Sequence, residues 1–194
     1  MSYALMRIGC NAGSEMGKII YLVGMMGAGK STVGRILAGK TGWPWVDMDR
    51  QIEQERGLSI PRIFELLGEA GFRRMETDLL QRLSVRDRLV VSTGGGVILS
   101  EENRRILSET GLVVYLRVSA ETVLARTRGC TGRPKLAGDN KEERVRSLLE
   151  ARHPLYCATS DISFQSAEGS PAALAARILA HPRVGRLLSE DIHG

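Results

Sequence analysis

The sequence predicts an α/β fold built on a mainly parallel sheet. Short runs rich in aliphatic and β-branched residues alternate with helical stretches, as in strand–helix–strand units. The first run, residues 19–23, is apolar throughout, as expected of a strand buried on both faces of a parallel sheet. A glycine-rich loop and a helix follow it directly. With no internal repeat and no linker, 194 residues suit one domain.

Five strands and a set of helices are expected in alternation along the chain. The strands are predicted over residues 19–23, 45–47, 89–92, 112–118 and 162–164. The helices are predicted over 30–40, 49–56, from Ser59 onward, 69–83, 100–110, 119–129, 141–152 and 171–180. Serines at 59, 100 and 119 are candidate N-caps, and Gly57 is a candidate helix end.

Both chain ends and one internal segment lack this alternation. Residues 1–18 are expected to be a disordered leader, residues 19–180 the domain, and residues 181–194 a loose tail. Residues 129–140 are rich in glycine and proline and are long enough to form a functional flap.

Composition excludes several classes of protein. The 43% hydrophobic and 25% charged residues are globular proportions, and no run of 18 apolar residues predicts a membrane span. Three cysteines without paired spacing indicate free thiols in a reducing cytoplasm. The net charge of +5 is spread along the chain without a basic tail, so no nucleic-acid partner is expected. Arginines can instead bind anionic small molecules.

Residues 24–32 (GMMGAGKST), here called the phosphate loop, fit the pattern G-x-x-x-x-G-K-[ST]. The preceding strand and following helix are the context that this motif requires. Its glycines let backbone N–H groups surround phosphate oxygens, and the helix N-terminus adds partial positive charge. Lys30 is expected to reach the β- and γ-phosphates and Ser31 to bind Mg²⁺. The expected ATP-binding residues are Gly27, Ala28, Gly29, Lys30, Ser31 and Thr32.

Two further strands end in residues suited to an acceptor site at the same sheet edge. One of the carboxylates of Asp47 and Asp49 could hold Mg²⁺ through water while the other accepts a hydroxyl proton. The alternative for Asp49 is capping of the next helix. Three consecutive glycines after another strand could let a ligand approach the backbone, or could form a flexible turn; they are Gly94, Gly95 and Gly96.

Charged side chains on two helices are further candidates. Arg73 and Glu76 share one helix face, where a solvated ion pair is the alternative interpretation. Arg152 is expected to end a helix, where pairing with the helix dipole is the alternative.

Together these motifs resemble the shikimate kinase family over about residues 18–179. The shared motifs, in the family's order, are D-x-D at 47–49, G-F-R-x-x-E at 71–76, T-G-G-G at 93–96, R-P-x-L at 133–136 and R-x-P-L-Y at 152–156. The resemblance implies a three-layer P-loop kinase fold whose five parallel strands have the order 2-3-1-4-5, with helices on both faces. It also implies a helical substrate-binding segment over about 49–83 and a lid over about 129–140.

The resemblance further implies transfer of the ATP γ-phosphate to the 3-hydroxyl of shikimate, giving shikimate 3-phosphate and ADP. This is a step of aromatic amino-acid biosynthesis, carried out in the cytoplasm by a monomer. In such enzymes the counterpart of Asp49 holds the acceptor hydroxyl and acts as its base. The counterpart of Asp47 supports Mg²⁺ through water. Lys30 and Arg133 are then catalytic, and Arg133 binds ATP phosphates.

The implied acceptor contacts come from three other parts of the chain. Arg73 and Arg152 match arginines that bind the substrate carboxylate. Gly95 matches a glycine that contacts the substrate. Glu76 resembles a residue that orients Arg73 or a substrate hydroxyl.

Two positions depart from the family pattern. Lys135 replaces the first leucine of the usual R-P-L-L lid motif, and residues 165–169 (QSAEG) lack the family's late arginine near the adenine. The alternatives are a kinase for another small hydroxy acid such as gluconate, a nucleoside monophosphate kinase, or a nucleotide-dependent switch without an acceptor.

Overall fold

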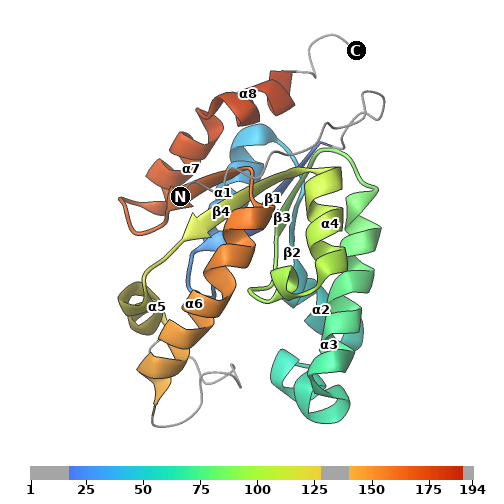
Figure 1. The fold of residues 1–194 in the computed structure, drawn as a ribbon. Coiled ribbons are helices and arrows are strands. Elements are labelled where there is room, and N and C mark those ends of the chain that lie inside the picture. The colour runs from blue at the N-terminus through green and yellow to red at the C-terminus, as the bar shows by residue number, and fades with distance from the viewer. Residues whose placement is uncertain (1–17, 128–139, 190–194) are drawn as a thin grey trace.

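A parallel sheet of five strands forms the middle layer of the structure, a computed structural model that describes residues 18–127 and 140–189 (Figure 1). The strands are β1 (Ile19–Val23), β2 (Trp45–Asp47), β3 (Leu89–Ser92), β4 (Leu112–Arg117) and β5 (Ile162–Gln165). They lie in the order β2-β3-β1-β4-β5, and every neighbouring pair is parallel. The predicted strand order 2-3-1-4-5 is confirmed.

Helices cover both faces of this sheet. They are α1 (Lys30–Thr41), α2 (Met48–Arg56), α3 (Ile60–Ser84), α4 (Glu101–Thr110), α5 (Ala120–Arg126), α6 (Lys141–Thr159), α7 (Pro171–Leu179) and α8 (Pro182–Ser189). A short 3₁₀ helix, η1 (Val97–Leu99), follows β3 and was not expected from the sequence. In Figure 1, α7 and α8 lie on the opposite side of the sheet from α3 and α4.

Two buried apolar clusters fix these layers, one on each face. Alternate side chains of β1 point to opposite faces, so Ile20 and Leu22 join the cluster under α1 and α7. Ile19, Tyr21 and Val23 join the cluster under α2, α3 and α4. The central strand β1 is buried on both faces of the sheet, and this explains its continuous apolar run.

The carboxyl ends of three adjacent strands bring the predicted motifs to one edge. The phosphate loop follows β1, Asp49 lies in the first turn of α2 after β2, and the three glycines follow β3 soon after its end. In open parallel sheets this edge is where ligands bind.

Two helix boundaries differ from the sequence expectation. Asp47, not Asp49, caps α2, since its Oδ1 accepts from the backbone N–H of Arg50 at 3.3 Å. Helix α6 does not end at Arg152 but runs through Pro154 to Thr159. Proline removes only one backbone donor, and the buried ring of Tyr156 stacks on Tyr115 at 4.8 Å, which holds the turns beyond it.

The two helices expected on either side of residue 68 are joined end to end as α3. Gly68 has non-helical angles within it (φ 66°, ψ 179°), so the helix bends there. A positive φ is a conformation that glycine adopts without steric cost. Before the bend, the backbone N–H of Ile60 donates to Glu53 Oε1 of α2 at 2.9 Å, so the start of α3 lies beside α2 within the expected substrate-binding region.

The expected loose tail over 181–194 is wrong for residues 182–189, which form α8. Val184 and Leu187 of this helix are buried in the apolar cluster that also contains Ile20 and Leu22, and Arg183 pairs with Asp161 at 3.1 Å. Eight residues give too few helical periods for this amphipathic pattern to stand out in the sequence.

The remaining residues of the expected leader, lid and tail lie outside the described residues, apart from Lys18, Asn140 and His181. In the two described ranges, no helix combines the length and the apolar character that crossing a bilayer requires.

Candidate active site

A pocket of about 480 Å³ opens at the carboxyl edge of the sheet. Its walls come from the phosphate loop, α2, α3, the glycine run after β3, and α6. The predicted site residues that line it are Gly27, Gly29, Lys30, Ser31, Thr32, Asp47, Asp49, Arg73, Glu76, Gly94, Gly95, Gly96 and Arg152. Ala28 does not line it and is buried. Arg133 lies outside the described residues.

The phosphate loop has the conformation that its glycines were expected to provide. Gly27 and Gly29 have φ of 76° and 88°, and Gly29 is the N-cap of α1. No side chain caps this helix, so its first backbone N–H groups remain available for an anion. The ammonium of Lys30 donates to the carbonyl oxygens of Gly24 (2.8 Å) and Met25 (3.0 Å), which holds a positive charge inside the loop.

Two carboxylates converge on Gly94 from different helices. A Cβ added to Gly94 would clash with Glu76 Oε1 and would lie 2.9 Å from Asp49 Oδ1. Only glycine leaves room for both, so the flexible-turn alternative does not account for this position. A hydroxyl group placed here would meet a carboxylate base from α2.

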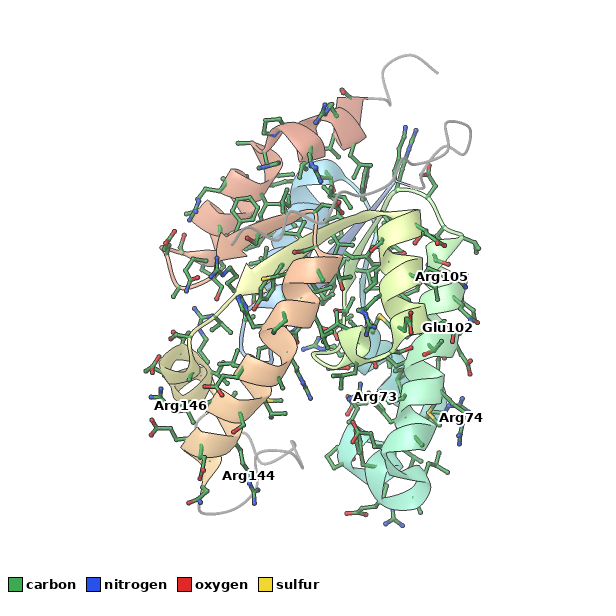
Figure 2. The ribbon with its side chains drawn as sticks, viewed as in Figure 1. Arg73, Arg74, Glu102, Arg105, Arg144 and Arg146 are labelled. Carbon is green, nitrogen blue, oxygen red and sulfur yellow. The ribbon has the colours of Figure 1, made fainter. Side chains whose placement is uncertain are left out.

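Arg73 lies against the last of the three glycines. A Cβ added to Gly96 would lie 2.5 Å from Arg73 Cζ, so the guanidinium occupies the space that a side chain would need. Arg73 donates to Glu76 at 2.6 Å and to Glu69 at 3.3 Å. Figure 2 shows Arg73 on the inner side of α3 and Arg74 on its outer side. Because Glu76 is only 1% exposed, the alternative of a solvated ion pair is wrong.

Arg152 reaches the same pocket from α6, on the other side. It is 3% exposed and its Nη1 donates to the carbonyl oxygen of Gly95 at 3.1 Å. Since α6 continues for two more turns, Arg152 is not at a helix end, and dipole pairing does not explain it.

Three buried polar atoms of this pocket have no hydrogen-bond partner in the structure: Arg73 Nε, Arg152 Nε and Glu76 Oε1. Leaving such groups unpaired is costly, and orphaned buried atoms at one pocket indicate that a ligand supplies the partners. Two guanidinium donors call for an anion, and a carboxylate oxygen calls for a donor such as a hydroxyl. The pocket therefore suits a small hydroxy acid.

Burial and neighbouring charges shift the pKa values of Glu76 and Arg73. Burial raises the pKa of the Glu76 carboxyl, and Asp49 adds to the rise while Arg73 opposes it. Although burial works against the charge of Arg73, the neighbouring Glu76 and Glu69 raise its pKa above the ordinary value. The guanidinium therefore stays cationic, and the carboxylate beside it depends on that charge.

The residues that could hold a metal are few. In the described ranges, no three His, Cys, Asp or Glu side chains gather in a way that could hold a metal ion. Ser31 and Asp47 both line the pocket beside the phosphate loop. Mg²⁺ keeps most of its waters and is bound through one or two protein oxygens plus substrate phosphates, so this sparse donor set fits Mg²⁺ bound with a nucleotide.

Several residues that shape the site were missed from the sequence. Apolar walls come from α3, where Ile60, Phe64 and Phe72 line the pocket. Their helical spacing was the available signal, but it equally indicates a core face. Arg126 of α5 donates to the carbonyl oxygens of Gly27 (2.9 Å) and Ser166 (3.4 Å), which ties the phosphate loop to the turn after β5. No sequence motif marked Arg126.

Comparison with known proteins places these features in a family. The family model described as "Shikimate kinase" matches residues 26–182. A shikimate kinase of Halorhodospira halophila is 46% identical over 160 residues, covering 82% of this chain and 90% of that protein. One of Aromatoleum aromaticum is 44% identical over 160 residues, covering 82% of this chain and 91% of that protein.

The structural comparison agrees with the sequence comparison. The structure of shikimate kinase from Acinetobacter baumannii in complex with shikimate superimposes with a TM-score of 0.82 at 42% identity. The match covers 91% of this chain and 95% of that one. At this identity and coverage the similarity extends well beyond the P-loop fold.

Proposed function

The chain belongs to the shikimate kinase family, and from that premise we propose that it transfers the γ-phosphate of ATP to the 3-hydroxyl of shikimate. The products are shikimate 3-phosphate and ADP, in the biosynthesis of aromatic amino acids. One observation carries the choice of acceptor. Two buried arginines from α3 and α6 flank one pocket, and each has an unpaired Nε, beside an unpaired carboxylate oxygen of Glu76.

The donor half of the reaction belongs to the phosphate loop. Backbone N–H groups at the start of α1 bind the β- and γ-phosphates, and Lys30 places its ammonium on them. Ser31 and, through water, Asp47 would hold Mg²⁺, which neutralises charge on the phosphates when bound. Arg133 is proposed to add a further positive charge to the ATP phosphates.

The acceptor half belongs to α2, α3, α6 and the glycine run. Arg73 and Arg152 bind the carboxylate of shikimate, and a guanidinium can do so with two parallel hydrogen bonds. Gly95 lines the pocket, and its backbone is proposed to contact the ring of the acid. Asp49 accepts the proton of the 3-hydroxyl as its oxygen attacks the γ-phosphorus.

Glu76 has two tasks in this proposal. Its Oε2 fixes the direction of Arg73 through the 2.6 Å ion pair. Its unpaired Oε1 accepts from a hydroxyl of the bound acid. Burial and charge repulsion from Asp49 both raise the pKa of Glu76 and favour its protonated form, whereas Arg73 opposes this rise by stabilising the carboxylate.

We further propose that the protein acts as a cytoplasmic monomer. The unpaired spacing of three cysteines supports the reducing compartment. Size-exclusion chromatography with light scattering would give the mass in solution, and a mass of two chains would contradict the monomer.

A coupled assay of ADP release with shikimate, gluconate and AMP tests the function. Release that depends on shikimate alone supports the proposal. ADP release with gluconate or AMP but not with shikimate would indicate one of the alternative kinases. ATP hydrolysis that needs no acceptor would indicate the nucleotide-dependent switch. Both arginines and both carboxylates suit a hydroxy acid better than AMP or a switch without an acceptor, and the family match favours shikimate over gluconate.

A further inference from the structure

We infer that Trp45 and Ser92 are positioning residues that fix the distance between the phosphate loop and the acceptor side of the pocket. The inference rests on the proposed phosphoryl transfer and adds two side chains that touch neither substrate. It starts from a chain of two hydrogen bonds that crosses from β2 through β3 to α1, here called the Trp45–Ser92 bridge.

The bridge has a defined direction. The indole Nε1 of Trp45 donates to Ser92 Oγ at 3.0 Å, and Ser92 Oγ donates to the backbone oxygen of Lys30 at 2.9 Å. An indole N–H can only donate and a carbonyl oxygen can only accept, so the serine hydroxyl has one possible orientation. Ser92 is 1% exposed, so water does not replace either bond.

The bridge joins the three segments that carry the chemistry. Lys30 is the first residue of α1, and its carbonyl belongs to the turn that presents Ser31. Trp45 lies two residues before Asp47, at the start of the strand that leads to Asp49. Ser92 is the last residue of β3 and directly precedes Thr93 and the three glycines.

Strand pairing alone does not make this connection. Asp47 lies opposite Ser92 in the parallel pair of β2 and β3, so those two strand ends are already in register. Helix α1 packs on the sheet through apolar side chains, which resist separation but allow sliding. The bond from Ser92 to Lys30 is directional, and it fixes the position of the first turn of α1 along the strands.

Gly34 gives independent evidence that the bridge is built into α1. A Cβ added there would lie 2.5 Å from Ser92 Oγ and 2.6 Å from Trp45 Nε1. Glycine is unfavourable inside a helix, and neither a positive φ nor a turn calls for it at this position. The space that Gly34 leaves is filled by the bridge. Arg35 lies over the Trp45 ring, with Cζ 5.0 Å from its centroid, and this cation–π contact also helps to hold the indole.

Phosphoryl transfer is sensitive to such a spacing. The attacking oxygen must be in line with the leaving oxygen, and catalysis depends almost wholly on positioning and charge. A small shift of Asp49 relative to Lys30 would lower the rate without changing what either substrate touches. It would also give water more opportunity to attack, because the acceptor hydroxyl is less well placed.

The test uses two variants and a matched control. Trp45→Phe keeps an aromatic ring but removes the N–H, and Ser92→Ala removes the hydroxyl. The control is Trp43→Phe, a buried tryptophan two residues away that belongs to the apolar cluster and not to the bridge. Each protein is assayed for kcat, for KM of ATP and shikimate, and for ADP released per shikimate 3-phosphate formed. Unfolding temperatures are measured in parallel.

We expect kcat to fall about three- to tenfold in Trp45→Phe, which loses one neutral hydrogen bond, and at least as much in Ser92→Ala, which loses both bonds of the bridge. Both KM values should stay within about twofold, and ADP release per product should rise. The double variant should lose less than the product of the two single effects, because both act through one chain. Trp43→Phe should lower the unfolding temperature and leave kcat and the coupling ratio unchanged.

Unchanged kcat and coupling in Trp45→Phe would overturn the inference, even if its unfolding temperature drops. The same holds if Trp43→Phe lowers kcat as much, since the effect would then be general destabilisation. If Ser92→Ala does not fold, the half-buried Trp45 site decides alone. Failure of the proposed function is distinct, because the unmodified protein would then show no shikimate-dependent ADP release.

Discussion

Nη1 of Arg73 lies 2.6 Å from Oε2 of Glu76, and the two partners differ sharply in exposure. The side chain of Arg73 is 20% exposed toward the pocket, whereas that of Glu76 is 1% exposed. The carboxylate is therefore the fixed partner, and the guanidinium takes its direction from it. Removing one partner of a buried pair leaves the other charge uncompensated, so this contact affects both stability and acceptor binding.

The first prediction is a pH-dependent stability difference between the unmodified protein and Glu76→Gln. Burial and Asp49 raise the pKa of this carboxyl in the folded state against the opposition of Arg73. A raised carboxyl pKa favours folding below the unfolded pKa, and that contribution is lost as pH rises through the folded pKa. We therefore expect the unfolding temperature of the unmodified protein, relative to Glu76→Gln, to fall as the pH rises above the ordinary pKa of a glutamate, about 4.3.

Glu55→Gln is the control because its pKa shifts the other way. The hydrogen bond from Arg82 lowers the pKa of the Glu55 carboxyl, so its contribution is present above the unfolded pKa and lost as pH falls. Since this pair is on the surface, the difference should be small. Circular dichroism melts at several pH values measure both. A Glu76→Gln difference that does not vary with pH would contradict the raised pKa.

The second prediction concerns the proposed base. Asp49→Asn keeps the shape of the side chain but cannot take a proton, so kcat should fall by about 10²–10⁴-fold. Nucleotide affinity should be unchanged, because the phosphate loop is intact. Steady-state kinetics and a nucleotide titration measure the two effects. Asp78→Asn, on the exposed side of α3, should behave as the unmodified protein. If only the KM for shikimate rises, Asp49 positions the acceptor without taking its proton.

The third prediction uses the glycine beside Arg73. An added Cβ at Gly96 would lie 2.5 Å from Arg73 Cζ, so Gly96→Ala should displace the guanidinium and raise the KM for shikimate at least tenfold. The affinity for ATP should not change. Gly39→Ala is the matched control, since nothing lies within 4 Å of a Cβ there and it sits inside α1. It should raise stability by about 0.5–1 kcal/mol and leave both KM values alone. A normal shikimate KM in Gly96→Ala would show that Arg73 does not need its observed position.

Local sequence patterns predicted most of the secondary structure of this protein. The phosphate loop and the five strands follow from motifs and apolar runs that each lie within a few residues, whereas the strand order came from the family resemblance. The end of α6 was predicted wrongly because Pro154 is a local helix-breaking signal, whereas the buried stack of Tyr156 on Tyr115 is a contact between distant segments. Helix α8 was missed because its buried positions are only two, Val184 and Leu187.

At the acceptor site, too, some features could be predicted from the sequence and others could be learned only from the structure. The convergence of Arg73 and Arg152 came from the family resemblance, since spacing cannot bring α3 and α6 together. That their Nε atoms are buried and unpaired could be learned only from the packed structure. The Trp45–Ser92 bridge likewise joins residues 47 apart in sequence, and a tryptophan and a serine in strands carry no motif.

The last prediction concerns the carboxylate of the acceptor. Arg73 and Arg152 lie on different helices and flank one pocket, so the proposal requires that both guanidinium groups bind one anion. Removing one partner from such a desolvated charged contact costs about 2–5 kcal/mol, which is roughly 30- to 4,000-fold in kcat/KM. An exposed pair would be worth at most about 1 kcal/mol, or roughly fivefold.

We therefore expect Arg73→Lys and Arg152→Lys each to lower kcat/KM for shikimate at least tenfold, because an ammonium cannot make two parallel hydrogen bonds. The two effects should be non-additive, since both arginines bind one group. The uncharged carboxamide of shikimate should be a poor substrate of the unmodified protein, and the lysine variants should discriminate less between acid and amide. Arg74→Lys, on the outer side of α3, is the control and should behave normally. If both lysine variants have normal activity and the acid and the amide are used equally well, the two arginines do not bind a carboxylate. The acceptor would then have to be sought among neutral polyols.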